Sequence, residues 1–145
     1  MDKIDAFVDE LQERIFDEAR EALGDKGFDR WRNPRFNGRM GDPDGYARLK
    51  GGCGDTMEIF LRFEGNRVRE ASYTTDGCAS SAICGSFAAE LALGRDPDQL
   101  TDVTAEMVLE TIGKLPEEDR HCTTLAAATL QEALSDYMAG GGNKG

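Results

Sequence analysis

The sequence predicts an α+β domain built around a small antiparallel three-stranded sheet that is packed with helices. Two observations carry this prediction. Apolar and polar residues alternate between 56 and 75, with a turn signal in the middle, which is typical of a strand hairpin. From residue 79 onward, small and apolar residues recur at helical spacing. Strands followed by helices favour an antiparallel sheet that is covered on one face.

The first segment predicts an amphipathic helix with many acidic residues. Its apolar residues recur at helical spacing until Gly24 ends the pattern: Ile4, Phe7, Val8, Leu11, Ile15, Ala19 and Leu23. We expect this helix to pack on the rest of the domain. Docking to a partner and dimerisation are the alternatives that the pattern leaves open.

The middle of the chain predicts a long loop and then the sheet. Glycine, proline and aspartate mark turns throughout residues 27–54, so we expect irregular structure there, with 46–50 as a candidate third strand. Met57 to Glu64 alternates as a half-buried strand does, Gly65 and Asn66 supply a turn, and residues 68–75 form the return strand.

Four helical patterns follow the sheet. They begin after Cys78, at Asp96-Pro97, at Thr104 and near His121. We expect three parts in the chain: an amphipathic helix over 1–26, the main domain over 27–139, and a flexible tail over 140–145.

Charge and composition exclude several classes of partner. The 145 residues carry a formal net charge of −11, which repels phosphate, so we expect neither nucleic acid nor an anionic membrane as a partner. The first residues lack the pattern of a secretory or transit signal, which predicts a cytoplasmic protein. In a reducing compartment, the four cysteines are expected to serve metal binding or chemistry.

Residues of metal-binding type gather at the boundaries between predicted elements. They are Cys53, Asp55, Cys78, His121 and Cys122. Such boundaries can converge at one end of a sheet, and these donors suit tetrahedral Zn²⁺ or an iron-sulfur cluster. His121 and Cys122 cannot both point the same way from a regular helix, so we expect one of them to bind the metal while the other waits or exchanges with it.

Each of these residues also has a structural interpretation. A cysteine can be a small buried side chain, Asp55 can cap a turn, and a lone histidine is often a hydrogen-bonded surface residue. Cys78 falls at a helix N-terminus, where unpaired N–H groups favour an anion such as a thiolate. Cys84, six residues further along the same helix, is expected to be buried among small side chains.

Several stretches of the chain occur in an order that is known from one family. They are Trp31-Arg32-Asn33-Pro34-Arg35, Gly52-Cys53-Gly54-Asp55, Asp76-Gly77-Cys78-Ala79-Ser80-Ser81-Ala82-Ile83, Glu90, Gly94-Arg95, Leu115-Pro116, His121-Cys122 and Tyr137. Over roughly three quarters of its length, the chain thereby resembles the IscU/NifU-type (N-terminal NifU-like) iron-sulfur cluster assembly scaffolds. This resemblance implies the family's α+β fold.

The resemblance also implies a ligand set and partners. Cys53, Cys78 and Cys122 would be the cluster thiolates, with Asp55 or His121 as the fourth donor. Aspartate at this place is associated with a labile cluster, and a hard oxygen donor is a weaker ligand for iron than a thiolate. Cys122 would be the persulfide acceptor, in keeping with a thiolate at a helix start. Family members take sulfur from a cysteine desulfurase and iron from a donor, assemble a [2Fe-2S] cluster, and pass it to apo-proteins.

One departure from the family pattern bears on partners. In Leu115-Pro116-Glu117-Glu118-Asp119, acidic residues replace the second proline and the lysine of the family's chaperone motif. This argues against recognition by the dedicated Hsp70 chaperone.

The sequence therefore predicts a non-enzymatic scaffold that builds and transfers a [2Fe-2S] cluster. One alternative is a zinc-bound persulfide acceptor for a cysteine desulfurase, which uses the same donors. A third hypothesis, from a different class, is an acidic adaptor whose thiols are only structural.

Overall fold

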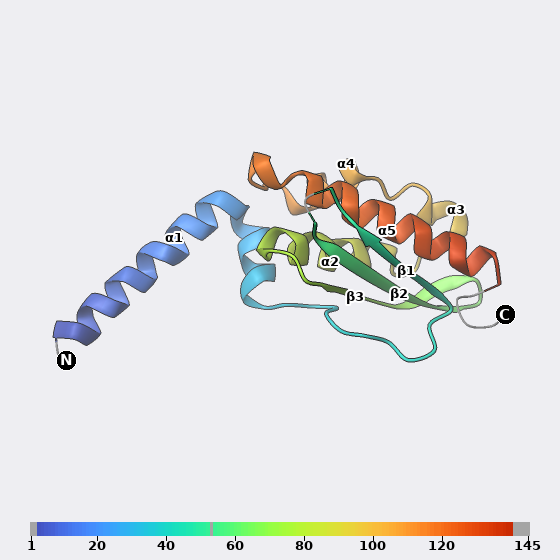
Figure 1. The fold of residues 1–145 in the computed structure, drawn as a ribbon, viewed down its shortest axis with the longest axis horizontal. Helices are drawn as coiled ribbons and strands as arrows, with labels where there is room; N and C mark the ends of the chain where they lie inside the picture. Colours follow the sequence, from blue (N-terminus) through green and yellow to red (C-terminus); the bar gives the residue numbers. More distant parts are fainter. Residues whose placement is uncertain (1–2, 53, 141–145) are drawn as a thin grey trace.

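The computed structural model describes residues 3–52 and 54–140. Its elements, shown in Figure 1, are α1 (Lys3–Arg32), β1 (Gly45–Lys50), β2 (Thr56–Glu64), β3 (Arg67–Thr75), α2 (Ala79–Ala92), α3 (Pro97–Leu100), α4 (Ala105–Ile112), η1 (Glu117–Asp119) and α5 (His121–Met138). None of the helices in this part of the chain is both long and apolar enough to cross a membrane.

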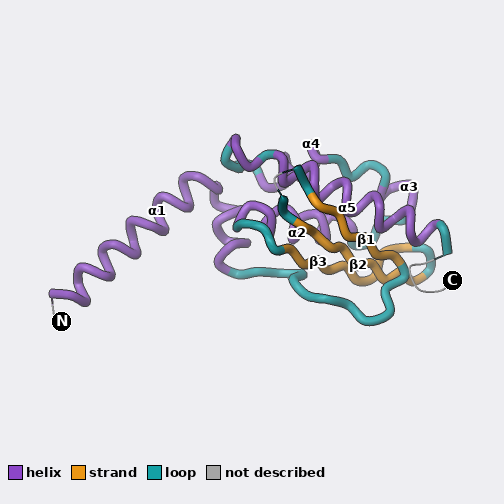
Figure 2. Tube along the Cα trace, viewed as in Figure 1, coloured by secondary structure: helices purple, strands orange, loops and turns teal. Residues whose placement is uncertain are grey.

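The sheet has the predicted antiparallel topology, in the order β1-β2-β3. Ala47 pairs with Ile59, which in turn pairs with Tyr73. The predicted candidate strand at 46–50 is thus confirmed as β1. In Figure 2 the segment after α1 runs along the sheet, and its Asn37 forms a bridge to Tyr73 that covers the outer edge of β3.

The core lies between the sheet and the helices α2 and α5 (Figure 1). Met57, Ile59 and Leu61 of β2 are completely buried, and Leu130 of α5 is buried with them. This placement confirms the α+β class with helices packed on one face of the sheet. It also brings the beginnings of α2 and α5 to the end of the sheet where β2 starts.

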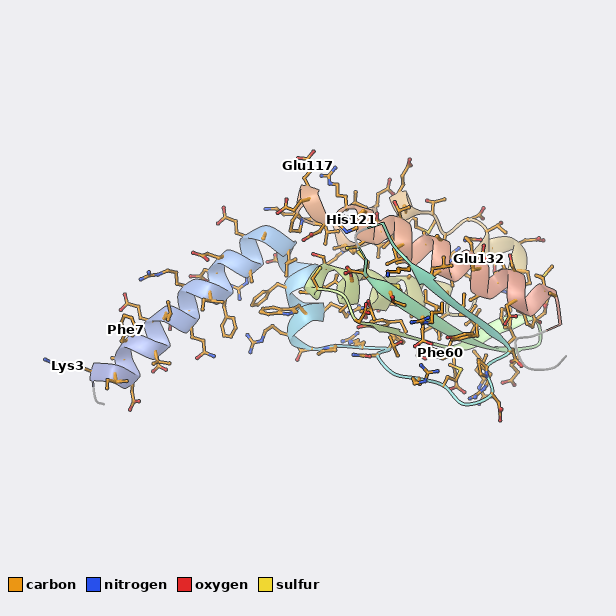
Figure 3. All side chains as sticks on the ribbon, in the orientation of Figure 1. Lys3, Phe7, Phe60, Glu117, His121 and Glu132 are labelled. Carbon is orange, nitrogen blue, oxygen red and sulfur yellow. The ribbon has the colours of Figure 1, made fainter. Side chains whose placement is uncertain are left out.

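The first part of α1 projects from the body of the protein, as Figures 1 and 3 show. Its apolar face is open: 69% of Ile4 and 65% of Phe7 are exposed, and Val8, Leu11 and Ile15 are exposed as well. The expectation that this helix packs on its own domain is therefore wrong for residues 3–15, whereas Leu23 near its end is buried. Amphipathic spacing predicts that a helix has an apolar face, but not which molecule covers that face.

Gly24 marks a kink in α1, with φ 75° and ψ 173°, and the helix then continues to Arg32. The irregular structure expected from residue 27 therefore begins only after this second helical part. Contacts with the body stabilise it. Arg30 is buried and donates to Ser86 Oγ at 2.9 Å and to Glu90 Oε1 at 2.7 Å, both on α2. Glycine tolerates the positive φ that this kink requires.

Candidate metal centre

Three of the predicted ligands meet at one end of the sheet. Asp55 lies directly before β2, and His121 and Cys122 are the first two residues of α5. One ligand atom from each of these three side chains lies within 4.8 Å of the others, which is close enough for a single ion to bind all three. Figure 3 shows His121 at the start of α5.

Both His121 and Cys122 face this site, so the expectation that they cannot point the same way is wrong, while which of them binds a metal stays a prediction. His121 Nε2 lies 3.7 Å from Cys122 Sγ. Helical side chains tilt toward the N-terminus of their helix, and no earlier turn of α5 blocks the space before these two residues. The exposed histidine can therefore lean back over the buried cysteine.

Asp55 is held by the turn that precedes it. The Gly51 amide donates to the Asp55 carbonyl at 2.7 Å, and the Gly54 amide donates to the Gly51 carbonyl at 3.1 Å. These bonds place the Asp55 side chain over the start of α2. Cys53 lies outside the described residues, so its predicted role as a ligand stays a prediction.

Cys78 is the residue before the first turn of α2 and is exposed. Its Sγ lies 4.0 Å from Ser81 Oγ, at the edge of the group formed by Asp55, His121 and Cys122. On its other side it lines a cavity of about 230 Å³ together with Trp31, Asn37 and Tyr73. Cys78 and His121 are therefore the exposed predicted ligands among those the structure describes, whereas Cys122 is buried.

Ser81 is a site residue for which the sequence predicts no role, although it lies in the motif around Cys78. It is completely buried, and its hydroxyl donates to Asp55 Oδ2 at 2.7 Å. The same oxygen lies 3.3 Å from Cys122 Sγ. Its position three residues after Cys78, on the same face of α2, is a signal that could have found it.

Burial governs the protonation of the cysteines. It raises the pKa of the Cys122 thiol to about 11, and the negative charges of Asp119 and Asp55 add to the rise. Burial thus opposes the thiolate form that is expected at a helix start. Burial also raises the pKa of Cys84, which is completely buried in the core as predicted.

The donor set fits a borderline or soft metal. A carboxylate oxygen, an imidazole nitrogen and a cysteine sulfur are ligands that both Zn²⁺ and iron accept. Three donors leave one position of a tetrahedron, for which Cys78 and Cys53 are the predicted candidates. The fold and the site together define an α+β protein with a candidate metal-binding group, Asp55, His121 and Cys122, at one end of its sheet.

The chain also matches known proteins. Residues 22–143 match the NifU-like N terminal domain family. Iron-sulfur cluster assembly scaffold protein IscU 1 of Archaeoglobus fulgidus is 36% identical over 115 residues, which span 79% of this chain and 75% of the relative. The scaffold protein IscU of Azotobacter vinelandii is 31% identical over 121 residues, which span 80% of this chain and 94% of the relative.

A solved structure shares the fold. The crystal structure of a nitrogen-fixing NifU-like protein (N-terminal) from Brucella abortus superimposes with a TM-score of 0.65 at 18% identity, covering 83% of this chain and 97% of that one. The chain therefore belongs to the NifU-like N-terminal domain family.

Proposed function

We propose that this protein is a cytoplasmic scaffold on which a labile [2Fe-2S] cluster is assembled and from which the cluster passes to apo-proteins. It takes sulfur from a cysteine desulfurase and iron from a donor, and it is not itself a turnover catalyst. The observation that carries the proposal is the meeting of Asp55, His121 and Cys122 within 4.8 Å. Relatives of this chain are named as iron-sulfur cluster assembly scaffolds, which supports the same function.

The mixed set of ligands suits a cluster that must later be released to a recipient protein. Thiolates bind iron strongly, whereas a carboxylate oxygen is a harder donor and exchanges more readily. Asp55 is tied to the protein by a glycine-rich turn, while Cys122 is fixed on a buried helix start. Loss of the cluster is therefore expected to begin at Asp55, with Cys122, Cys78 and Cys53 as the remaining thiolate ligands.

Sulfur delivery requires a nucleophile, and we assign this role to Cys122. Its sulfur attacks the terminal sulfur of the desulfurase persulfide, a new S–S bond forms, and the donor's S–S bond breaks to release the donor thiolate. His121 Nε2, at 3.7 Å from Cys122 Sγ, is placed to accept the thiol proton. Because Cys122 is completely buried, Asp55 or His121 must move aside before the donor can reach it.

A zinc-bound persulfide acceptor is the second candidate function. The same observation favours it, because one carboxylate, one imidazole and thiolates also form a typical zinc site. In this case Zn²⁺ would hold the ligands until the desulfurase displaces one of them, and no cluster would form.

Anaerobic reconstitution with a cysteine desulfurase, cysteine and Fe²⁺ tests these proposals. A visible chromophore that contains iron and sulfide in equal amounts supports the scaffold, and stoichiometric colourless zinc supports the second candidate. Protein without either would leave only structural thiols and would contradict both. Cys122→Ser should abolish persulfide uptake and Cys84→Ala should retain it, since the Cys84 side chain lies in the core.

A further inference from the structure

We propose that Ser81 is a positioning residue that holds the Asp55 carboxylate in place for metal binding, and that Gly77 keeps the space this pair occupies. The inference rests on the proposed function insofar as it concerns the same metal centre. It assigns a role to two residues that contribute no ligand of their own.

Ser81 lies between donors from three elements. Its Oγ is 2.7 Å from Asp55 Oδ2, 3.3 Å from Cys122 Sγ and 4.0 Å from Cys78 Sγ. The residue is completely buried, so water does not compete for its hydroxyl. Since the single hydroxyl proton is donated to Asp55, its oxygen remains free to accept from the Cys122 thiol.

Gly77 gives independent evidence that the space beside Ser81 and Asp55 must stay free of side-chain atoms. A Cβ at residue 77 would lie 2.5 Å from Asp55 Oδ2 and 2.6 Å from Ser81 Oγ. Both distances are below 3.0 Å, which is closer than a Cβ atom approaches another heavy atom in real structures. Every other amino acid at this position would therefore push the carboxylate or the hydroxyl away.

The hydrogen bond gives Asp55 a defined orientation. Because Oδ2 accepts the Ser81 proton, the carboxylate cannot rotate freely, and its other oxygen is left to bind a metal ion. Groups that hydrogen-bond to a metal ligand orient it, and removing them commonly weakens metal binding by about 10- to 100-fold. Ser81 is the described residue that fills this role for Asp55.

Titration with Co²⁺ alone, followed by its thiolate and d–d absorption bands, tests the role of Ser81. Ser81→Ala should raise the dissociation constant for Co²⁺ by about 10- to 100-fold and change the d–d bands, and Ser81→Thr should restore both because it keeps the hydroxyl. Ser80→Ala is the matched control. Ser80 is a buried neighbour on α2 whose hydroxyl bonds to Asp119 at 2.9 Å, and its loss should leave the dissociation constant within about threefold.

A double-mutant cycle separates positioning from a general structural role. If Ser81 acts through Asp55, Ser81→Ala should change Co²⁺ binding by less than about twofold in the Asp55→Ala background. An equal loss in both backgrounds would overturn the inference, as would unchanged binding by Ser81→Ala alone. If Ser81→Ala does not fold, Gly77→Ala replaces it in the cycle. A loss of Co²⁺ binding that disappears in the Asp55→Ala background then supports the inference, and an equal loss in both backgrounds overturns it.

The two proposals fail in different ways. Wild-type protein that binds Co²⁺ as tightly as Ser81→Ala overturns only the role of Ser81. Wild-type protein that binds no Co²⁺ overturns the metal centre and, with it, the role of Ser81.

Discussion

Glu58 gathers three hydrogen bonds on the outer face of the sheet. Thr74 Oγ1 and Arg39 Nη1 donate to its Oε1 at 2.7 Å and 2.6 Å, and the Tyr46 hydroxyl donates to its other oxygen. Burial alone would raise the pKa of Glu58, but these hydrogen bonds and the Arg39 charge together lower it below its ordinary value.

This shift predicts an acid-sensitive contribution to stability. Because the folded pKa lies below the unfolded value of 4.5, Glu58 stabilises the fold above that pH, and the contribution is lost as the pH falls through the folded pKa. Glu58→Gln should lower the free energy of unfolding by about 1–2 kcal/mol at neutral pH and should lose less further stability than the wild type in acid.

Urea denaturation above and below pH 4.5 measures both effects. Glu64→Gln is the control, because Glu64 is exposed and should show neither effect. Equal acid sensitivity of Glu58→Gln and the wild type would contradict the assignment.

Among single residues, the sequence predicts the candidate ligands better than the residues that hydrogen-bond to them. Asp55, His121 and Cys122 stand out because their side chains can bind metals and sit at element boundaries. Ser81 does not stand out, because it lies in a run of small residues and helical spacing alone does not mark any of them as functional. Asp55 and Cys122 come from distant segments, and only the folded chain brings them to the Ser81 hydroxyl.

Among the elements, the sheet and the helices after Cys78 follow from local pattern, because strand alternation and helix caps act over a few residues. The second part of α1 does not. Its turn-forming residues suggest a loop, whereas burial of Phe28 and Arg30 against the body stabilises helix instead. Tertiary contacts there outweigh local preference.

The projecting part of α1 predicts a dispensable segment. Residues 3–15 are all exposed, and Phe16 is the first residue of α1 that is partly buried. Removing residues 1–15 should therefore shift the melting temperature by less than about 2 °C. Phe28→Ala in the full chain should lower it by several degrees, because Phe28 is buried and contacts Phe16 and Trp31.

Differential scanning calorimetry compares the two variants with the wild type. A large drop on removal of residues 1–15 would mean that the apolar face of α1 is covered in solution. Such a result would contradict the separation of this segment from the main domain.

At the scale of the whole molecule, the candidate metal site joins segments that are distant in sequence. Asp55 precedes the central strand, and His121 and Cys122 begin the last helix. An ion that binds all three stabilises the folded state because the unfolded chain does not hold them together.

Zn²⁺ should therefore raise the melting temperature. At about 100 times its dissociation constant it adds about 2.7 kcal/mol, which for a chain of this length corresponds to about 6–10 °C. Asp55→Ala should reduce this shift, Cys84→Ala should keep it, and a chelator should reverse it. Thermal melts with and without Zn²⁺ provide the measurement, and an equal shift in Asp55→Ala would exclude Asp55 as a ligand.

The tight packing of α2 on the sheet determines which side of the candidate metal site has room to move. A Cβ at Gly85 would lie 2.6 Å from the Tyr73 ring, so the helix that carries Cys78 and Ser81 has no room to shift toward β3. On the opposite side, Gly52 and Gly54 flank the approach to Asp55 and are open to solvent. The exposed glycine turn beside Asp55 is thus the part of the candidate site with room to move, and the tightly packed start of α2 is the part that stays fixed.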